Sequence, residues 1–201
     1  MGRHREFCRD EAVRSATALF WRQGYEATSM SDLTRALGIG RQSLYDTFGD
    51  KRALFMECLE HYCAEVDAGV DAVLEAEGLV LANLRRLLEI AAEQAHTSDF
   101  RGCLLGNTLA ELGSADPGLD ALLLRKLERW FRRFERVFTR AQDNGELVSS
   151  ADVTVLARAL TAYLQGAALA NRVWREPSAI AQTLQGAWLL VEMYAPGRGQ
   201  S

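Results

Sequence analysis

The residues of this chain that best fit a chemical task lie between Arg41 and Thr47, in the segment RQSLYDT. Leu44 and Phe48 are four residues apart, which places both on the inner side of a predicted helix. The polar residues predicted to face outward are Arg41, Gln42, Ser43, Asp46 and Thr47. Arginine is the usual reader of guanine in the major groove of DNA, and glutamine the usual reader of adenine. A short helix with these side chains is suited to contact base edges.

Neighbouring residues carry groups that suit phosphate. Tyr45 can offer its hydroxyl while its ring packs against the helix. Lys51 begins the next predicted helix, where its charge and the free backbone N–H groups favour an anion. Thr28 and Ser29, at the start of the preceding helix, can also donate to phosphate. The sequence thus predicts base readers flanked by phosphate anchors.

Asp46 fits this picture less simply, because a carboxylate is repelled by phosphates. It can accept a hydrogen bond from cytosine N4, or it can serve a local role as a cap within the helix. Both roles are compatible with its position, and we favour the local one.

These side chains need two short helices and a tight turn to present them. The segment from Thr28 to Lys51 has this layout, with Gly38-Ile39-Gly40 as the turn, and it is typical of a helix-turn-helix. Short helices joined by glycine also occur in helical bundles that bind no DNA. The spacing by itself therefore leaves both interpretations open.

Composition indicates an all-α protein. Hydrophobic residues make up 48% and charged residues 25% of 201 residues, and all three prolines lie at or beyond Pro117. The net charge is −4, but residues 1–60 carry nine basic and nine acidic residues, so the acidic excess lies in 61–201. DNA binding requires a local basic surface and not a basic protein.

Apolar spacing, caps and glycines predict about nine helices along the chain. After a first helix over 6–23, a second begins at a cap among 28–31 and ends near residue 37, and a third covers 41–48. The others are predicted at 51–74, 79–96, 103–112, 117–144, 151–172 and from 177 to before 196. A loop is predicted at 97–102, and the tail 196–201 is predicted to be disordered.

Several function classes find no support. The four cysteines show no metal-ligand spacing, and His4, His61 and His96 are scattered, so we expect no metal, no cofactor and no enzyme active site. The N-terminus MGRHREFCRD does not resemble a signal peptide. No apolar run approaches ~18 residues, so we expect no membrane span and a cytoplasmic location.

The first quarter of the chain resembles the tetracycline-repressor (TetR/AcrR) family of bacterial transcriptional regulators. The resemblance covers about 6–58, and its matching residues are Ala16, Leu19, Phe20, Gly24, Tyr25, Thr28, Ser29, Leu33, Ala36, Leu37, Gly38, Ile39, Ser43, Leu44, Tyr45, Phe48, Lys51 and Leu54. It implies a three-helix DNA-binding head at 1–50 and a helical ligand-binding and dimerisation body at 51–195. It also implies that Tyr45 and Lys51 contact phosphates. The chain departs from the family at Gly40, Gln42 and Asp46-Thr47, which leaves the base contacts less defined than the fold.

The last two predicted helices, about 151–195, are the expected homodimer interface. The eighth is rich in small residues, which allow helices to approach closely: Ala157, Ala159, Ala162, Gly166, Ala167 and Ala168. The ninth carries Ile180, Leu184, Trp188 and Val191 at helical spacing. These faces can instead pack within one chain, but a two-fold operator favours a dimer.

The seventh helix has six basic residues between Arg125 and Arg136, which we expect to form a solvated face.

The body is expected to bind a largely apolar effector with one or two polar anchors. The candidate pocket residues are Cys103, Asn107, Trp130, Phe134, Tyr163 and Trp174. Cys103 has a second interpretation, because a helix N-terminus beside Arg101 favours a reactive thiolate. It can also be a small packing residue.

These observations predict a homodimeric repressor that binds a palindromic double-stranded DNA operator and is released by a small molecule. One alternative is a repressor that senses oxidants or electrophiles through Cys103. A second alternative, from another class, is a helical adaptor that binds another protein without specific DNA binding.

Overall fold

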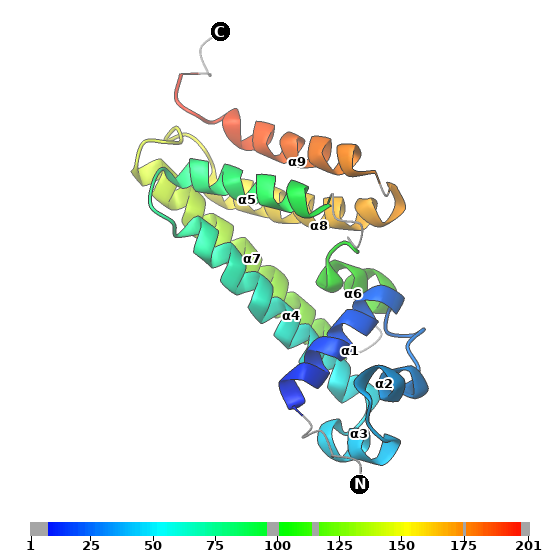
Figure 1. The fold of residues 1–201 in the computed structure, drawn as a ribbon. Coiled ribbons are helices and arrows are strands. Elements are labelled where there is room, and N and C mark those ends of the chain that lie inside the picture. The colour runs from blue at the N-terminus through cyan, green and yellow to red at the C-terminus, as the bar shows by residue number, and fades with distance from the viewer. Residues whose placement is uncertain (1–7, 96–100, 114–116, 175, 198–201) are drawn as a thin grey trace.

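The computed structural model describes residues 8–95, 101–113, 117–174 and 176–197, and the regular structure in these ranges is helical throughout, as predicted (Figure 1). The helices are α1 Arg9–Gln23, α2 Met30–Leu37, α3 Arg41–Phe48, α4 Lys51–Leu74, α5 Val80–Ala95, α6 Leu104–Leu112, α7 Pro117–Asp143, α8 Val153–Trp174 and α9 Pro177–Glu192. The predicted bounds of α3 and α4 are confirmed, and those of the other helices differ by up to about three residues. The predicted helical residues 6 and 7, most of the predicted loop 97–102 and the tail 198–201 lie outside the described residues.

Local signals explain the head, α1 to α3. Ser29 caps α2 by accepting from the backbone N–H of Asp32 at 3.1 Å, and Asp32 in turn accepts from the backbone N–H of Ser29 at 3.1 Å. Gly38 ends α2 with φ 67°, a left-handed conformation that glycine adopts without strain. Asp50 caps α4 by accepting from the backbone N–H of Ala53 at 2.7 Å.

The molecule is long, with α3 near one end and α9 near the other, and α4 and α7 run between them (Figure 1). α1 packs against the first half of α4, and a buried cluster joins them through Phe20, Phe55 and Leu59. The same cluster includes Leu104 of α6 and Leu122 of α7. The head therefore shares its core with the near end of the body. A displacement of α6 would change the packing of this shared core.

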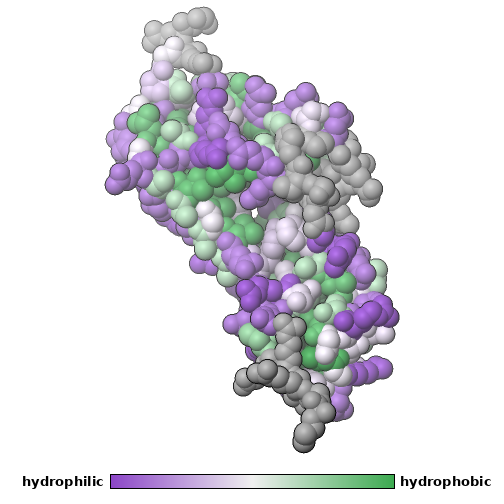
Figure 2. All heavy atoms as spheres, in the orientation of Figure 1, coloured by the Kyte–Doolittle hydropathy of each residue, from purple (hydrophilic) through white to green (hydrophobic). Residues whose placement is uncertain are grey.

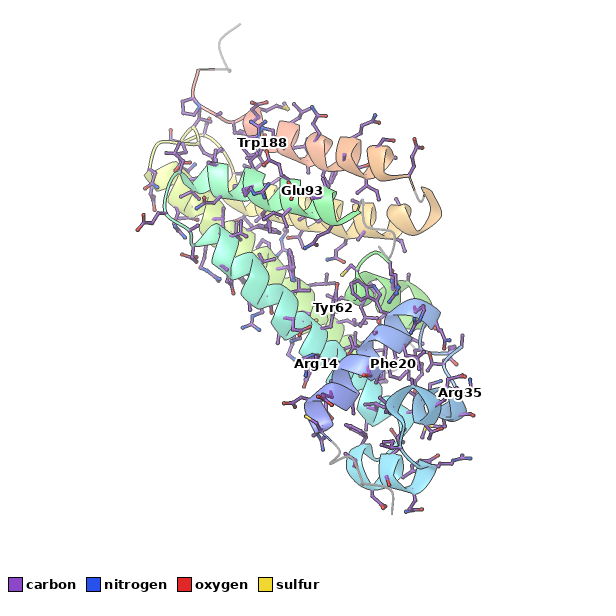
Figure 3. The ribbon with its side chains drawn as sticks, in the orientation of Figure 1. Arg14, Phe20, Arg35, Tyr62, Glu93 and Trp188 are labelled. Carbon is purple, nitrogen blue, oxygen red and sulfur yellow. The ribbon has the colours of Figure 1, made fainter. Side chains whose placement is uncertain are left out.

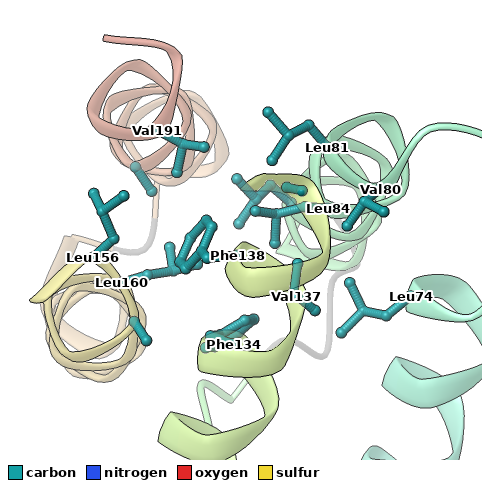
Figure 4. Close-up of a cluster of buried hydrophobic side chains, with 14 of the residues drawn as sticks. Leu74, Val80, Leu81, Leu84, Phe134, Val137, Phe138, Leu156, Leu160 and Val191 are labelled. Atoms are coloured by element: carbon teal, nitrogen blue, oxygen red, sulfur yellow. The ribbon is translucent and has the colours of Figure 1, made fainter. Parts of the chain in front are cut away.

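A second buried cluster forms the core of the body, where α7 packs against α8 and α5 against α9. Phe134 and Phe138 are fully buried at its centre (Figure 4). The predicted stripe of α9 also belongs to it: Ile180, Leu184 and Val191 are buried within the chain. The prediction that this stripe forms the dimer face was therefore wrong, because it covers the core of its own chain.

The expected solvated face of α7 needs one correction. Arg133 is 3% exposed and donates from Nη1 to Asp67 Oδ1 at 2.8 Å and from Nε to Asp71 Oδ1 at 2.7 Å. Both acids lie on α4, so this arginine links the two long helices. Burial disfavours its charge, but the hydrogen bonds to the two acids outweigh burial and raise the pKa of Arg133 above its ordinary value.

α8 is more apolar than expected. Its stretch Val153–Ala170 is long and apolar enough to cross a membrane by length and composition, although Arg158 interrupts it. Only 28% of this stretch is buried inside the chain. It packs against α7 and α9 as a helix of the body. Over the body, apolar side chains are visible at the surface among polar ones (Figure 2).

Candidate DNA-binding interface

The inner side of α3 fixes this helix to the head. Leu44 is 0% exposed and Phe48 is 5% exposed, and both belong to the core that α1 and α4 share. Arg41, Gln42 and Ser43 on the other side are exposed. The structure thus gives α3 the predicted division into an anchored side and an outward side.

Residues one turn apart contact each other on the outward side of α3. The Arg41 guanidinium lies 5.8 Å from the centre of the Tyr45 ring, a cation–π contact. Thr47 donates its hydroxyl to the Ser43 backbone carbonyl at 2.7 Å, which commits the Thr47 proton to its own helix. Their predicted DNA contacts stay predictions.

Asp46 has a local partner, which agrees with the role we favoured. The partner is the side chain of Gln42, whose Nε2 donates to Asp46 Oδ1 at 2.8 Å, and not a helix cap. The two residues are separated by one helical turn, and both are exposed. Gln42, a predicted base reader, and Asp46 are therefore linked by a hydrogen bond.

Arg9 positions α3, a role that sequence reasoning missed. Its guanidinium forms two hydrogen bonds with the Glu57 carboxylate of α4, at 2.9 and 2.8 Å. It also donates to the Thr47 carbonyl at 3.1 Å and lies 5.0 Å from the centre of the Phe48 ring. One side chain thus connects α1, the end of α3 and α4. Its partners are far away in sequence, so no local pattern indicates the role.

Lys51 lies at the predicted start of α4, but it is not a freely extended side chain. Its Nζ lies 4.3 Å from the centre of the Tyr25 ring and 3.5 Å from the Glu26 carbonyl. The turn between α1 and α2 therefore holds the ammonium group in place. Its phosphate contact stays a prediction, with the position of the charge depending on this turn.

The two residues predicted to contact phosphate at the start of α2, Thr28 and Ser29, differ in exposure. Thr28 is 0% exposed and donates its hydroxyl to the Gly24 carbonyl at 2.6 Å, so the predicted contact of this hydroxyl with phosphate was wrong. The hydroxyl instead fixes the α1–α2 turn. Ser29 is exposed, and its hydroxyl donates to Asp32 Oδ2 at 2.6 Å. The hydrogen bonds from the Ser29 hydroxyl and from its backbone N–H lower the pKa of the Asp32 carboxyl.

Glu111 of α6 connects the body to the α1–α2 turn, which sequence reasoning also missed. Its carboxylate accepts from the backbone N–H groups of Tyr25 at 3.2 Å and Glu26 at 2.9 Å. A Cβ atom on Gly24 would lie 2.8 Å from Glu111 Oε2, and Gly24 also has a φ of 87°. The backbone conformation therefore favours glycine at this point, and a larger residue would also displace the Glu111 carboxylate from its place against the turn. The same turn holds Lys51.

A small cavity lies beside this connection. Its lining residues are Phe20, Trp21, Gly24, Tyr25, Phe55, Leu104, Asn107, Thr108 and Glu111. It has room for about one water molecule. Among the described residues, the buried Trp21 Nε1 and Asn107 Oδ1 atoms have no hydrogen-bond partner. The joint between α1 and α6 therefore combines aromatic walls with two unsatisfied polar atoms.

The predicted pocket residues are not brought together. Asn107 lines the cavity at the joint, whereas Trp130, Phe134 and Tyr163 pack in the core of the body. The Trp130 and Phe134 rings lie 5.6 Å apart, centre to centre. The side chain of Trp174 lies outside the described residues. The packing role, which is the commoner one for an aromatic stripe, accounts for Trp130 and Phe134.

Cys103 precedes α6 as its N-cap residue and is half-buried. It lies beside Tyr62 and Cys63 of α4 (Tyr62 is labelled in Figure 3). Burial raises the pKa of Tyr62 well above its ordinary value, and the pKa of Cys63 to about 12. Arg101 donates to the Ala18 carbonyl of α1 at 3.4 Å. Thiol sensing by Cys103 stays a prediction.

Two family profiles match this arrangement of a helix-turn-helix head on a helical body. Residues 12–58 match the bacterial regulatory proteins of the tetR family, and 80–187 match the tetracyclin repressor-like C-terminal domain. The chain belongs to the TetR family. It is therefore a DNA-binding transcriptional regulator and not an enzyme, and the adaptor alternative without specific DNA binding no longer applies.

Individual regulators are similar to this chain over most of its length and of their own. The HTH-type transcriptional regulator YezE of Bacillus subtilis is 35% identical over 162 residues, which are 80% of this chain and 84% of YezE. The HTH-type transcriptional repressor DhaR of Mycobacterium sp. is 28% identical over 88% of each chain. A solved structure of the regulator CifR, a cysteine mutant complexed with 26-bp operator DNA, has a TM-score of 0.80 and 29% identity. That match covers 94% of this chain and 98% of CifR.

Proposed function

We propose that this TetR family regulator is a homodimeric repressor that leaves a palindromic operator when a small molecule binds. In this proposal the outward side of α3 enters the major groove, where Arg41, Gln42, Ser43 and Thr47 reach base edges. Tyr45 and Lys51 contact phosphates on either side. The cytoplasm of a bacterium, where the chromosome lies, is its proposed location.

Exposed apolar residues of the last two helices support the homodimer. Val155 and Leu169 of α8 are 60% and 44% exposed, and Leu189 and Leu190 of α9 are 52% and 41% exposed. Met193, just after α9, is 68% exposed. Large apolar side chains concentrated on one pair of helices are typical of a surface that is covered in the assembly. The low burial of α8 in a single chain has the same explanation.

The contact of Glu111 with the α1–α2 turn is the observation that carries the release mechanism. Because the cavity beside it holds only about one water molecule, an effector can enter only if α6 moves away from α1. Such a movement separates Glu111 from the Tyr25 and Glu26 N–H groups and frees the turn that holds Lys51. We propose a small, largely apolar effector whose polar group meets Asn107.

DNA binding is tested by a mobility-shift assay on the DNA that flanks the gene for this chain. Lys51→Ala should weaken binding to all sequences about equally and reduce the salt dependence, because it removes one phosphate contact. Arg41→Ala should also change the sequence preference. A Lys51→Ala effect confined to particular bases would refute its role as a phosphate anchor.

The assembly and the effector need separate measurements. Sedimentation should give a dimer for the wild type and a smaller species for a Leu189→Glu, Met193→Glu double variant. A monomeric wild type at micromolar concentration would refute the homodimer. A thermal-shift screen of small molecules should find a stabilising compound that also releases DNA, and Asn107→Ala should reduce its effect. Release that does not depend on Asn107 would place the effector elsewhere.

A further inference from the structure

The small cavity at the joint between α1 and α6 is lined by two residues that each carry a buried polar atom without a partner. These residues are Trp21 of α1 and Asn107 of α6. Among the described residues, Trp21 Nε1 and Asn107 Oδ1 find no hydrogen-bond partner. Nearly all buried polar atoms in folded proteins are hydrogen-bonded, because an unpaired one bears its full desolvation cost. Two such residues around one cavity indicate a guest that pairs with both.

Both side chains are held in place by other contacts. The Trp21 indole packs edge-on against the Tyr62 ring of α4, with 5.2 Å between the ring centres. Asn107 is 6% exposed and donates from Nδ2 to the Arg101 carbonyl at 2.9 Å. Because a carbonyl oxygen only accepts, this hydrogen bond fixes which end of the Asn107 amide is the NH₂ group. The orientation of the amide therefore leaves Oδ1 as the atom that needs a partner.

The guest needs both a donor and an acceptor. An indole N–H only donates and an amide oxygen only accepts, so the guest must accept from Trp21 and donate to Asn107. The second hydrogen of Asn107 Nδ2 does not change this requirement, because Oδ1 still needs a donor. A carboxylate cannot donate, and it is repelled by the Glu111 carboxylate that lines the same cavity. An ammonium group cannot accept, so it leaves the Trp21 N–H unpaired.

The size of the cavity favours a hydroxyl group. The space holds about one water molecule, and a hydroxyl both donates and accepts through a single oxygen atom. We propose that this cavity binds a hydroxyl group between Trp21 Nε1 and Asn107 Oδ1, and that the effector is a small alcohol with an apolar body. The inference rests on the proposed function, because it names the polar group of the effector that separates α6 from α1.

The test uses the full-length protein and four probes built on one ring, which are benzyl alcohol, benzoate, benzylammonium and toluene. The indole N–H signals of the four tryptophans in a proton–nitrogen NMR spectrum report binding, and Trp21→Phe identifies the Trp21 signal by its loss. Benzyl alcohol should shift this signal and bind at least about fivefold more tightly than each other probe, which is the effect of one neutral hydrogen bond.

Two variants remove one polar partner each. Trp21→Phe keeps an aromatic ring without the N–H, and Asn107→Leu keeps the size of the side chain without the amide. Each should weaken benzyl alcohol binding by about fivefold in a thermal-shift titration. The matched control is Trp188→Phe, which removes an indole N–H from α9, where Trp188 packs against the core of the body. It should leave binding unchanged, and circular dichroism checks that all variants keep their helices.

Equal binding of the four probes, or equal binding of benzyl alcohol by wild type and both cavity variants, would overturn the inference. So would tighter binding of benzylammonium, which would make the aromatic walls and Glu111 a cation site. Absence of benzyl alcohol binding would assign the cavity to a water molecule alone and would also overturn it. None of these results affects the proposed function, which stands if another compound releases operator DNA. Binding of benzyl alcohol beside Trp21 without release of DNA would instead keep the hydroxyl site and overturn the proposed release mechanism.

Discussion

Replacement of Arg133 by alanine should destabilise the body strongly. Arg133 is 3% exposed and makes hydrogen bonds of 2.7 to 3.1 Å to Asp67 and Asp71. Asp67 is itself 6% exposed, so removal of the arginine leaves a buried carboxylate without its main partner. The free energy lost by removing Arg133 alone is larger than the net contribution of the intact ion pair. The reason is that the desolvation cost of Asp67 is no longer compensated by an opposite charge.

The magnitude follows from the burial of each acid. Breaking a buried ion pair from one side costs about 3–5 kcal/mol. The side chain of Asp71 is 51% exposed and can be hydrated, so most of the cost comes from Asp67. Arg129 lies 3.3 Å from Asp67 Oδ2 and compensates part of the lost charge. We therefore expect the free energy of unfolding to fall by about 3 kcal/mol, the lower end of that range.

The assay is urea unfolding, followed by tryptophan fluorescence and circular dichroism at one fixed protein concentration. The matched control is Arg132→Ala, one residue earlier, because the Arg132 side chain is 59% exposed and pairs with Glu128 and Glu135 at the surface. Its effect should be much smaller. A double variant, Arg133→Met with Asp67→Leu, should recover most of the stability. Equal losses for Arg132→Ala and Arg133→Ala would refute the reasoning.

Further predictions concern the joint and the thiols. Glu111→Ala should weaken operator binding several-fold with unchanged helix content, because it frees the α1–α2 turn; an unchanged affinity would remove Glu111 from the head–body connection. Burial raises the pKa of Cys58 and Cys63 to about 12, so only about one in 10⁴ of each is a thiolate at pH 8, and iodoacetamide should label Cys8 first by mass spectrometry. Early labelling of Cys63 would contradict its burial. If Cys103 is the sensor, an electrophile that releases the wild type from DNA should leave Cys103→Ser bound.

Sequence signals worked best where the cause is local. Residues at most a few positions apart determine the bounds of α3 and α4, the cap at Asp50 and the glycine turn. These features can therefore be predicted from the sequence. The family resemblance covered the same region and was confirmed. Local patterns could not tell which side of an amphipathic helix meets its own core, which is why the stripe of α9 was assigned to the dimer.

Sequence by itself determined the helical class of this protein, the helix-turn-helix and the residues on its outward side, because helix periodicity and capping act within a few residues. Only the tertiary structure decided which groups hold that helix-turn-helix in place. Arg9 meets Glu57 across 48 residues, and Glu111 meets Tyr25 across 86 residues. Thr28 directs its hydroxyl inward to Gly24. Such partners are chosen by the packing of whole helices, since a polar side chain bonds to whatever group the fold places within about 3 Å of it.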